Sequence, residues 1–141
     1  MAAYNKFQPF VENLAEKVHN LGSDTLKVLL TNSAPSAANS VKADLTELGA
    51  GNGYTAGGTA ATISSSAQTS GTYKLVLADV VFTASGGSIG PFRYAVLYND
   101  TPTSPADPLI AWWDYGSSLT IASGESFTVD FDGSAGVMTL A

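Results

Sequence analysis

From residue 25 onward, apolar and polar side chains alternate along most of the chain, and this two-residue period constrains the fold more than any other feature. The segment TLKVLLTN at 25–32 sets Leu26, Val28 and Leu30 against polar neighbours. The pattern, typical of half-buried strands, recurs at 73–84, 92–100, 108–116, 118–123, 126–133 and 137–141. Short strands separated by turn residues predict a mainly β, antiparallel sandwich or barrel. We expect a β-sandwich over 25–141, jelly-roll or immunoglobulin-like in layout.

The segment before these strands has a different period. Apolar residues recur at three- and four-residue steps, which predicts one amphipathic helix over 7–21, preceded by an N-terminal arm at 1–6. The residues on this stripe are Phe7, Phe10, Val11, Leu14, Val18 and Leu21. Gly22 follows where a helix would end. The helix is expected to pack against the sheet, to bind a partner, or to do both.

Length and charge limit the possible classes of protein. A chain of 141 residues that is 45% hydrophobic can bury one core, so we expect a single domain, 1–141. Its six basic residues are scattered against twelve acidic ones, which disfavours nucleic-acid binding. It has no cysteine. We see neither a signal peptide nor an apolar run of membrane-spanning length, and expect the chain to be made and kept in a cytoplasm without contacting a membrane.

The stretch GNGYTAGG at 51–58 matches the spacing of a dinucleotide-binding fingerprint. Such a fingerprint works where a buried strand delivers the glycines to a helix N-terminus. Here ADLTELGA precedes the stretch and TAATISSSAQTSG follows it, and neither flank fits. We therefore expect no nucleotide and no other cofactor. We interpret the stretch as a structural turn, with Tyr54 anchoring it to the sandwich and glycines providing its backbone freedom, at Gly51, Gly53, Gly57 and Gly58.

No group of residues indicates catalysis or metal binding. His19 is the only histidine, and no G-x-S-x-G motif accompanies it, so a nucleophilic triad has no anchor. Asp130 and Asp132 share one side of a strand, but the rest of a calcium loop is missing. Because side chains alternate along a strand, Asp130 and Asp132 can both lie on its solvent face while their neighbours enter the core, and no binding site is needed to explain them. We expect a protein without enzymatic activity.

Two strands carry more apolar residues than a sheet with one wet face requires. FRYAVLYND at 92–100 and PLIAWWDYG at 108–116 each place apolar side chains on both faces. A chain with one helix has little with which to cover a second face, so we expect part of it to meet another subunit or a larger protein surface. The candidate interface residues are Tyr4, Phe7, Arg93, Leu97, Ile110 and Trp112. We also expect 1–7 to serve as a strand-adding arm.

Several segments, taken in order, resemble small virion structural proteins of tailed bacteriophages and prophages. The resemblance runs from about Thr25 to Ala141, and GYTAGG with RYAVLYND is its strongest part. The matching segments are TLKVLLTNSAP, GNGYTAGG, TASGGSIG, RYAVLYNDT, PLIAWWDYGSS and SFTVDFDGSAGVMTLA. The resemblance implies a virion protein and transfers no catalytic residue.

Within that group, small β-sandwich proteins serve as head decoration (cement) proteins or as tail or fibre components. The leading hypothesis is a decoration protein that is made in the host cytoplasm and then binds the phage head. There it would be a homotrimer that cements the major capsid protein. The alternative is a tail or fibre component that binds host-surface glycans through Trp112, Tyr115 and the loop at 99–108.

Overall fold

The structure is a computed structural model that describes residues 2–141, and it is mainly β with antiparallel sheets, as expected for a β-sandwich. Met1, the first residue of the expected arm, lies outside the described residues. The helical segments are α1 (Pro9–Ala15) and the short 3₁₀ helix η1 (Lys42–Asp44). The strands are β1 (Asn5–Lys6), β2 (Leu26–Thr31), β3 (Thr59–Ala61), β4 (Ile63–Thr69), β5 (Thr72–Leu77), β6 (Val80–Thr83), β7 (Ile89–Asn99), β8 (Leu109–Ile121), β9 (Ser126–Val129) and β10 (Met138–Leu140).

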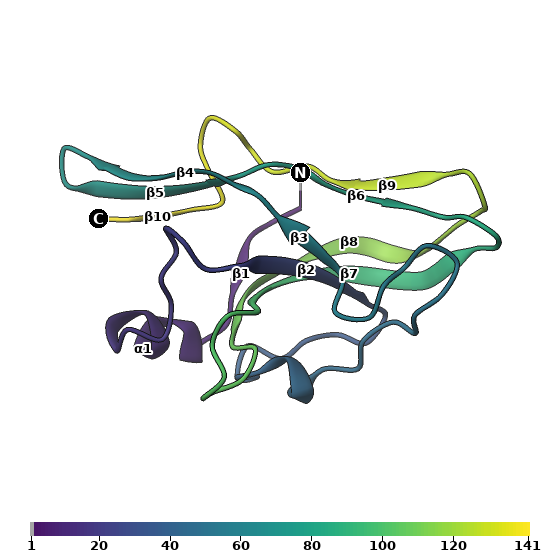
Figure 1. The fold of residues 1–141 in the computed structure, drawn as a ribbon, viewed down its shortest axis with the longest axis horizontal. Coiled ribbons are helices and arrows are strands. Elements are labelled where there is room, and N and C mark those ends of the chain that lie inside the picture. The colour runs from purple at the N-terminus through teal and green to yellow at the C-terminus, as the bar shows by residue number, and fades with distance from the viewer. Residues whose placement is uncertain (1) are drawn as a thin grey trace.

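The strands form two layers (Figure 1). One layer is a five-stranded antiparallel sheet in the order β1-β8-β7-β2-β3. The other consists of a three-stranded sheet, β10-β5-β4, and a two-stranded sheet, β6-β9, which follow one another along the first layer. The expected strand at 73–84 is divided between β5 and β6, and the segments at 108–116 and 118–123 are joined in β8. The expected strand boundaries were therefore wrong at both places: one strand at 73–84 is two, and two strands at 108–123 are one.

The main core lies between the two layers. Because side chains alternate along a strand, every second residue of β2 points into it, as do Ala95 and Leu97 of β7. Leu30 and Leu97 are fully buried. Phe82 of β6 and Leu77 of β5 come from the opposite layer. Burial of this apolar surface is the main favourable term that holds the two layers together.

A second apolar cluster covers the outer face of the five-stranded sheet. Leu45 of the connection at 32–58 and Trp112 pack against its buried members, which are Phe7, Leu29, Val96, Tyr98 and Leu109. The connection, which contains η1, runs below this sheet together with α1 (Figure 1). It is fixed there by main-chain hydrogen bonds, such as the one from Leu109 N–H to Ser40 C=O at 3.0 Å. The chain thus covers much of the second apolar face itself.

The helix is shorter than the apolar period predicts. It spans Pro9–Ala15 instead of 7–21. It begins late because the Phe7 N–H donates to the Ile110 carbonyl at 3.1 Å and so still belongs to the pairing with β8. It ends early because Lys17 adopts a left-handed conformation with φ of 68°. Leu21, the last apolar residue of the predicted stripe, lies in a turn after the helix and is buried in the core. Its spacing from the earlier apolar residues therefore results from core packing and does not indicate a further turn of helix.

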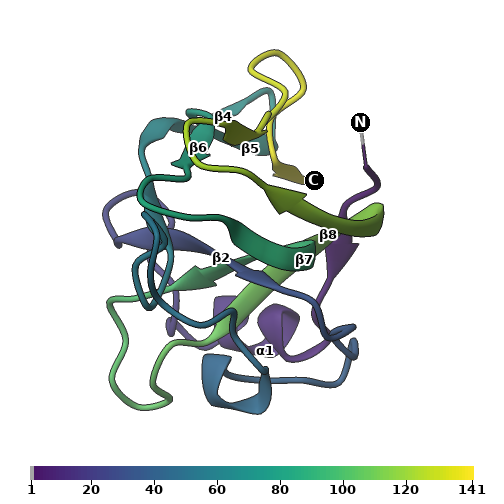
Figure 2. The same cartoon turned by 90° about the vertical axis from the view of Figure 1, so that its right-hand side faces the viewer.

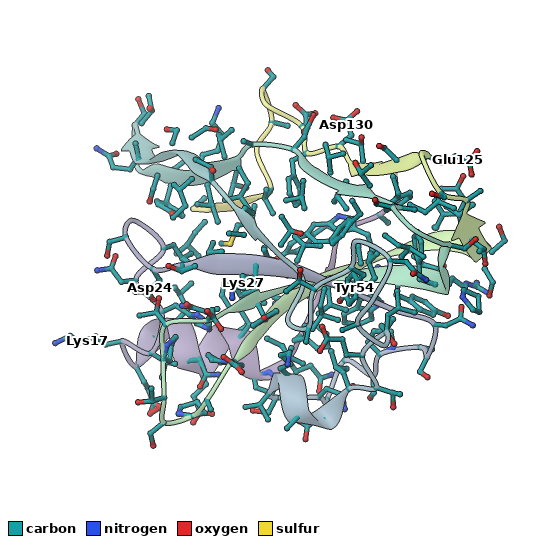
Figure 3. All side chains as sticks on the ribbon, turned by 45° about the vertical axis from the view of Figure 1, so that its right-hand side comes forward. Lys17, Asp24, Lys27, Tyr54, Glu125 and Asp130 are labelled. Atoms are coloured by element: carbon teal, nitrogen blue, oxygen red, sulfur yellow. The ribbon has the colours of Figure 1, made fainter. Side chains whose placement is uncertain are left out.

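The GNGYTAGG stretch holds one edge of the five-stranded sheet. The Tyr54 side chain is buried at the middle of the molecule (Figure 3), where its hydroxyl accepts the Leu30 N–H at 3.0 Å and donates to Glu47 at 2.9 Å. From the other face, the Tyr98 hydroxyl donates to the Gly57 carbonyl at 2.6 Å. Burial raises the pKa of the Tyr54 hydroxyl above its usual range, so it remains a neutral donor. A side chain at Gly58 would overlap the Val28 carbonyl.

Replacing Gly58 by alanine is expected to lower the free energy of unfolding by about 3 kcal/mol or more, measured by urea denaturation. The residue has φ of +79°, and its new Cβ would meet β2 main chain, which cannot move aside without breaking the sheet. Gly49→Ala is the matched control, since a Cβ at Gly49 has no neighbour within 4 Å, and its effect should be close to zero. Equal stability of the two variants would contradict this account of the turn.

His19 is a buried polar residue beside the helix. It is 6% exposed, its Nδ1 lies 3.1 Å from the Asn99 amide nitrogen, and its ring lies 5.1 Å from that of Phe10. The Asn99 amide also donates to Asp24 at 2.7 Å. Burial lowers the pKa of His19 to about 4, although the nearby Asp24 carboxylate acts in the opposite direction.

Stability is therefore expected to fall as the pH drops below the pKa of His19 in the unfolded chain, about 6.5. Between this pH and the folded pKa of about 4, His19 is protonated in the unfolded chain and neutral in the folded chain. The loss is on the order of 2 kcal/mol. Urea unfolding between pH 7 and about 5, above the carboxylate range, measures it. His19→Gln should remove most of the slope, and an unchanged slope would refute the assignment to His19.

Candidate functional site

An open groove of about 350 Å³ lies between the two layers, on the side where β8 and β9 lie. Figure 2 shows the N-terminal segment beside β8 on this side of the molecule. Aromatic residues from four different parts of the chain line the groove, namely Tyr4, Phe92, Tyr94, Trp113, Tyr115, Phe127 and Phe131. We call it the β8–β9 groove.

The aromatic rings of the groove support one another. Tyr4 lies edge-on to Trp113 with ring centroids 5.9 Å apart, and Trp113 meets Phe131 in the same way at 5.5 Å. Further along β8, Tyr115 packs edge-on against Phe127 at 5.8 Å. Such pairs contribute about 0.5–1.5 kcal/mol each beyond the area they bury. Tyr115 is nevertheless 55% exposed and Tyr4 36%, so the groove presents aromatic surface to its surroundings.

The edge of β8 along this groove is largely unpaired. β1 pairs with β8 only at Asn5↔Trp112 and Lys6↔Ala111. The Asn5 side-chain amide donates to the carbonyls of Ala3 and Trp112, at 3.0 and 3.3 Å, where the pairing of β1 with β8 stops. Among residues 2–141, no strand pairs with the outer edge of β8 beyond Trp112.

On the opposite side of the same sheet, the part of β2 that extends beyond β3 is closed. Beyond β3, the N–H of Leu30 on β2 is bonded to the Tyr54 hydroxyl, and the Leu30 carbonyl accepts the Leu48 N–H at 2.9 Å. These contacts leave no comparable opening along β2 for another strand. The uncovered parts of β2 and β8 therefore differ in their capacity to bind an extended chain.

The charges around the groove are mainly negative. Arg93 and Asp114 form a bidentate pair at 2.8 and 3.0 Å, and this hydrogen bonding lowers the pKa of the Asp114 carboxyl and raises that of Arg93. Asp132 accepts the amides of Ala135 and Ser134, which lowers its pKa. Asp130 is exposed on the upper layer (Figure 3). Since Arg93 balances Asp114, the remaining charge comes from Asp130 and Asp132.

Only some of the candidate interface residues lie at this site. Tyr4 and Arg93 line the groove. Trp112 is half-buried on the other face of β8, where its ring packs on Phe7 at 4.6 Å. The side chains of Phe7, Leu97 and Ile110 are fully buried, so the expectation that they face a partner was wrong for the folded chain. The expected arm is also partly used within the chain, because Asn5–Lys6 is strand β1.

The aromatic residues proposed for sugar binding do not form one surface. Trp112 contacts Phe7 on the outer face of the sheet, whereas Tyr115 contacts Phe127 between the layers. The ring that shares a face with Tyr115 is Trp113, two residues away on β8. The sequence analysis missed Trp113 and Phe127 as groove residues. Trp113 lies two residues before Tyr115, and this spacing placed the two on one face of a strand. The spacing did not show which face would remain open.

Other kinds of site find little support. Over residues 2–141, no group of three or more His, Cys, Asp and Glu side chains is placed to hold a metal ion. Within the same residues, no helix has the length and apolar character to cross a membrane. A search of protein-family models, of curated proteins and of solved structures found no match to this chain.

Tyr4→Ala is expected to uncover one side of the Trp113 indole and to shift its fluorescence emission to longer wavelength. The measurement needs Trp112→Phe in both proteins, so that Trp113 is the sole emitter. Loss of the ring pair should also lower the free energy of unfolding by about 1 kcal/mol. Val11→Ala, which removes an exposed apolar side chain outside the groove, serves as the control. An unshifted spectrum would show that Tyr4 does not cover Trp113 in solution.

Proposed function

We propose that this chain is a non-enzymatic structural protein of a tailed-phage virion, most specifically a capsid decoration protein. It is made in the bacterial cytoplasm and then binds the assembled head. Its partners are the major capsid protein and, in a homotrimer, further copies of itself. A jelly-roll or immunoglobulin-like layout of the sandwich belongs to the same proposal. Neither nucleic acid nor membrane is among the proposed partners.

The observation that carries the proposal is the open side of the sandwich. In the β8–β9 groove, exposed aromatic rings lie next to a strand edge that β1 pairs only at Trp112 and Ala111. Aromatic residues and unpaired strand edges are both common elements of protein–protein contacts. The ordered resemblance to virion proteins, strongest in GYTAGG and RYAVLYND, supports a phage shell as the protein that this surface meets.

A tail or fibre protein that binds host glycans is the second candidate. The exposed Tyr115 beside Trp113 favours it, because aromatic rings can stack on sugars. Under this alternative, the purified protein binds envelope polysaccharide of the host, and Tyr115→Ala abolishes this binding. Binding that survives the substitution would place any glycan outside the groove.

For the decoration role, particles made without this chain are expected to assemble normally but to release their DNA sooner on heating or chelation. Added purified protein should bind these particles and restore their resistance. Quantitative electrophoresis of washed particles measures the binding, and DNA release measured by dye fluorescence gives the stability. Detection of the chain only on purified tails would overturn the decoration role and favour the second candidate.

A further inference from the structure

We propose that the β8–β9 groove binds an extended segment of a partner protein, which adds as a strand to β8 next to β1 and carries basic residues at its ends. The inference rests on the proposed function for the origin of that partner, the phage shell. Its geometry depends only on contacts within this chain. Three features of the groove support it in turn.

The first feature is the main chain at Asp114. The Phe7 N–H donates to the Ile110 carbonyl, and the Asn5 side chain donates to the Trp112 carbonyl. In an antiparallel ladder, the N–H and C=O of alternate residues face the same edge. Asp114 is therefore the next residue that turns both groups toward this edge, and no described strand pairs with it there.

The unpaired edge of β8 is short. The Gly116 N–H already bonds to the Asp114 carboxylate at 2.8 Å, and Gly116 has φ of 102°, a conformation outside regular strand geometry. An added segment thus has room for only a few paired residues beside β1. The pairing that β1 begins at Lys6 and Asn5 shows which occupant suits this edge, namely an extended chain antiparallel to β8.

The second feature is the spacing of the aromatic residues. Trp113 and Tyr115 point to the same side of β8 and line the groove, whose opposite wall includes Phe127. Residues opposite each other in an antiparallel pair project to the same face of the sheet. Every second side chain of an added strand would therefore enter the groove, and apolar side chains there would cover rings that are now exposed.

The third feature is the charge. The Asp114 carboxylate is neutralised by Arg93, so the net charge of the groove comes from Asp130 and Asp132 on the opposite wall. The whole chain carries a net charge of −6. Basic residues in the partner segment, on the face that enters the groove, would complement these carboxylates and speed association.

A synthetic peptide, Lys-Thr-Val-Thr-Val-Thr-Lys, tests the inference with the full-length protein. Its Val and Lys side chains share one face, and its Thr main chains would face β8. At about millimolar concentration, it is expected to shift, saturably, the NMR signals of the Asp114 amide and the Trp113 indole. Replacing both Lys by Glu should weaken binding about tenfold or more, equivalent to about 1.4 kcal/mol.

Selective N-methylation separates strand addition from adhesion of side chains. Methylating the Thr nitrogens removes the donors that would pair with β8 and should abolish binding. Methylating the Val nitrogens, which would face away from β8, should leave most of it. Equal binding of the two methylated peptides would overturn strand addition, as would the absence of any saturable shift with the unmodified peptide.

Two protein variants test the walls of the groove. Tyr115→Ala removes an exposed aromatic side chain and should weaken peptide binding about tenfold, whereas Val11→Ala, an exposed apolar position on α1, should not.

Asp130→Lys should weaken binding of the Lys peptide and strengthen that of the Glu peptide. Glu12→Lys gives the same change of charge on α1, outside the groove lining. Circular dichroism checks that each variant is folded.

Other occupants of the groove would give different results. If maltohexaose shifts the Trp113 and Tyr115 signals and the peptide does not, the groove is a sugar site. If the chain self-associates, Tyr115→Ala abolishes this and the peptide does not bind, the occupant is a second copy. Either result overturns the inference. Peptide binding by a protein that does not bind heads would instead refute the decoration role and leave strand addition intact.

Discussion

The five-stranded sheet has two apolar faces, and covering both of them is the constraint on which the rest of the structure depends. One face meets the second β layer, and the other meets the connection that contains η1, with Leu45 packed against the outer cluster. A single helix of seven residues would be too small for this task. The long connection between β2 and β3 is therefore a structural element of the fold and not a free loop.

That cover is held in place from both faces of the sheet by the glycine-rich turn. Tyr54 enters the core between the layers, while the Gly57 carbonyl receives the Tyr98 hydroxyl from the outer face. Glu47 links the two ends of the turn, because it accepts both the Tyr54 hydroxyl and the Gly57 N–H. The turn thus binds to β2 through the Tyr54 side chain, whereas an edge strand would bind through main-chain hydrogen bonds.

The sequence predicted what depends on local periodicity and missed what depends on distant partners. Alternation identified both β2 and β7 as strands and the apolar faces of β2 correctly, but a register shift in β7 places Phe92 in the main core with Leu97. Alternation could not show that Val96, which points to the outer face of the sheet, would be covered by the chain itself. That cover comes from the irregular segment around Leu45. For the same reason, the groove was not foreseen, because Trp113 and Phe127 line a common groove only when β8 and β9 lie in facing layers.

The two sides of the five-stranded sheet explain why the groove is open where it is. On β2, the hydroxyl of Tyr54 and the amide of Leu48 take the main-chain groups of Leu30 that lie beyond β3. On β8, the contacts across the outer edge stop at Asn5, whose side-chain amide donates to the carbonyls of Ala3 and Trp112. The next residue facing that edge, Asp114, keeps its side chain bonded to Arg93 while its main chain remains available. The part of β2 beyond β3 is thus closed to an added strand, whereas β8 beyond Trp112 remains open to one.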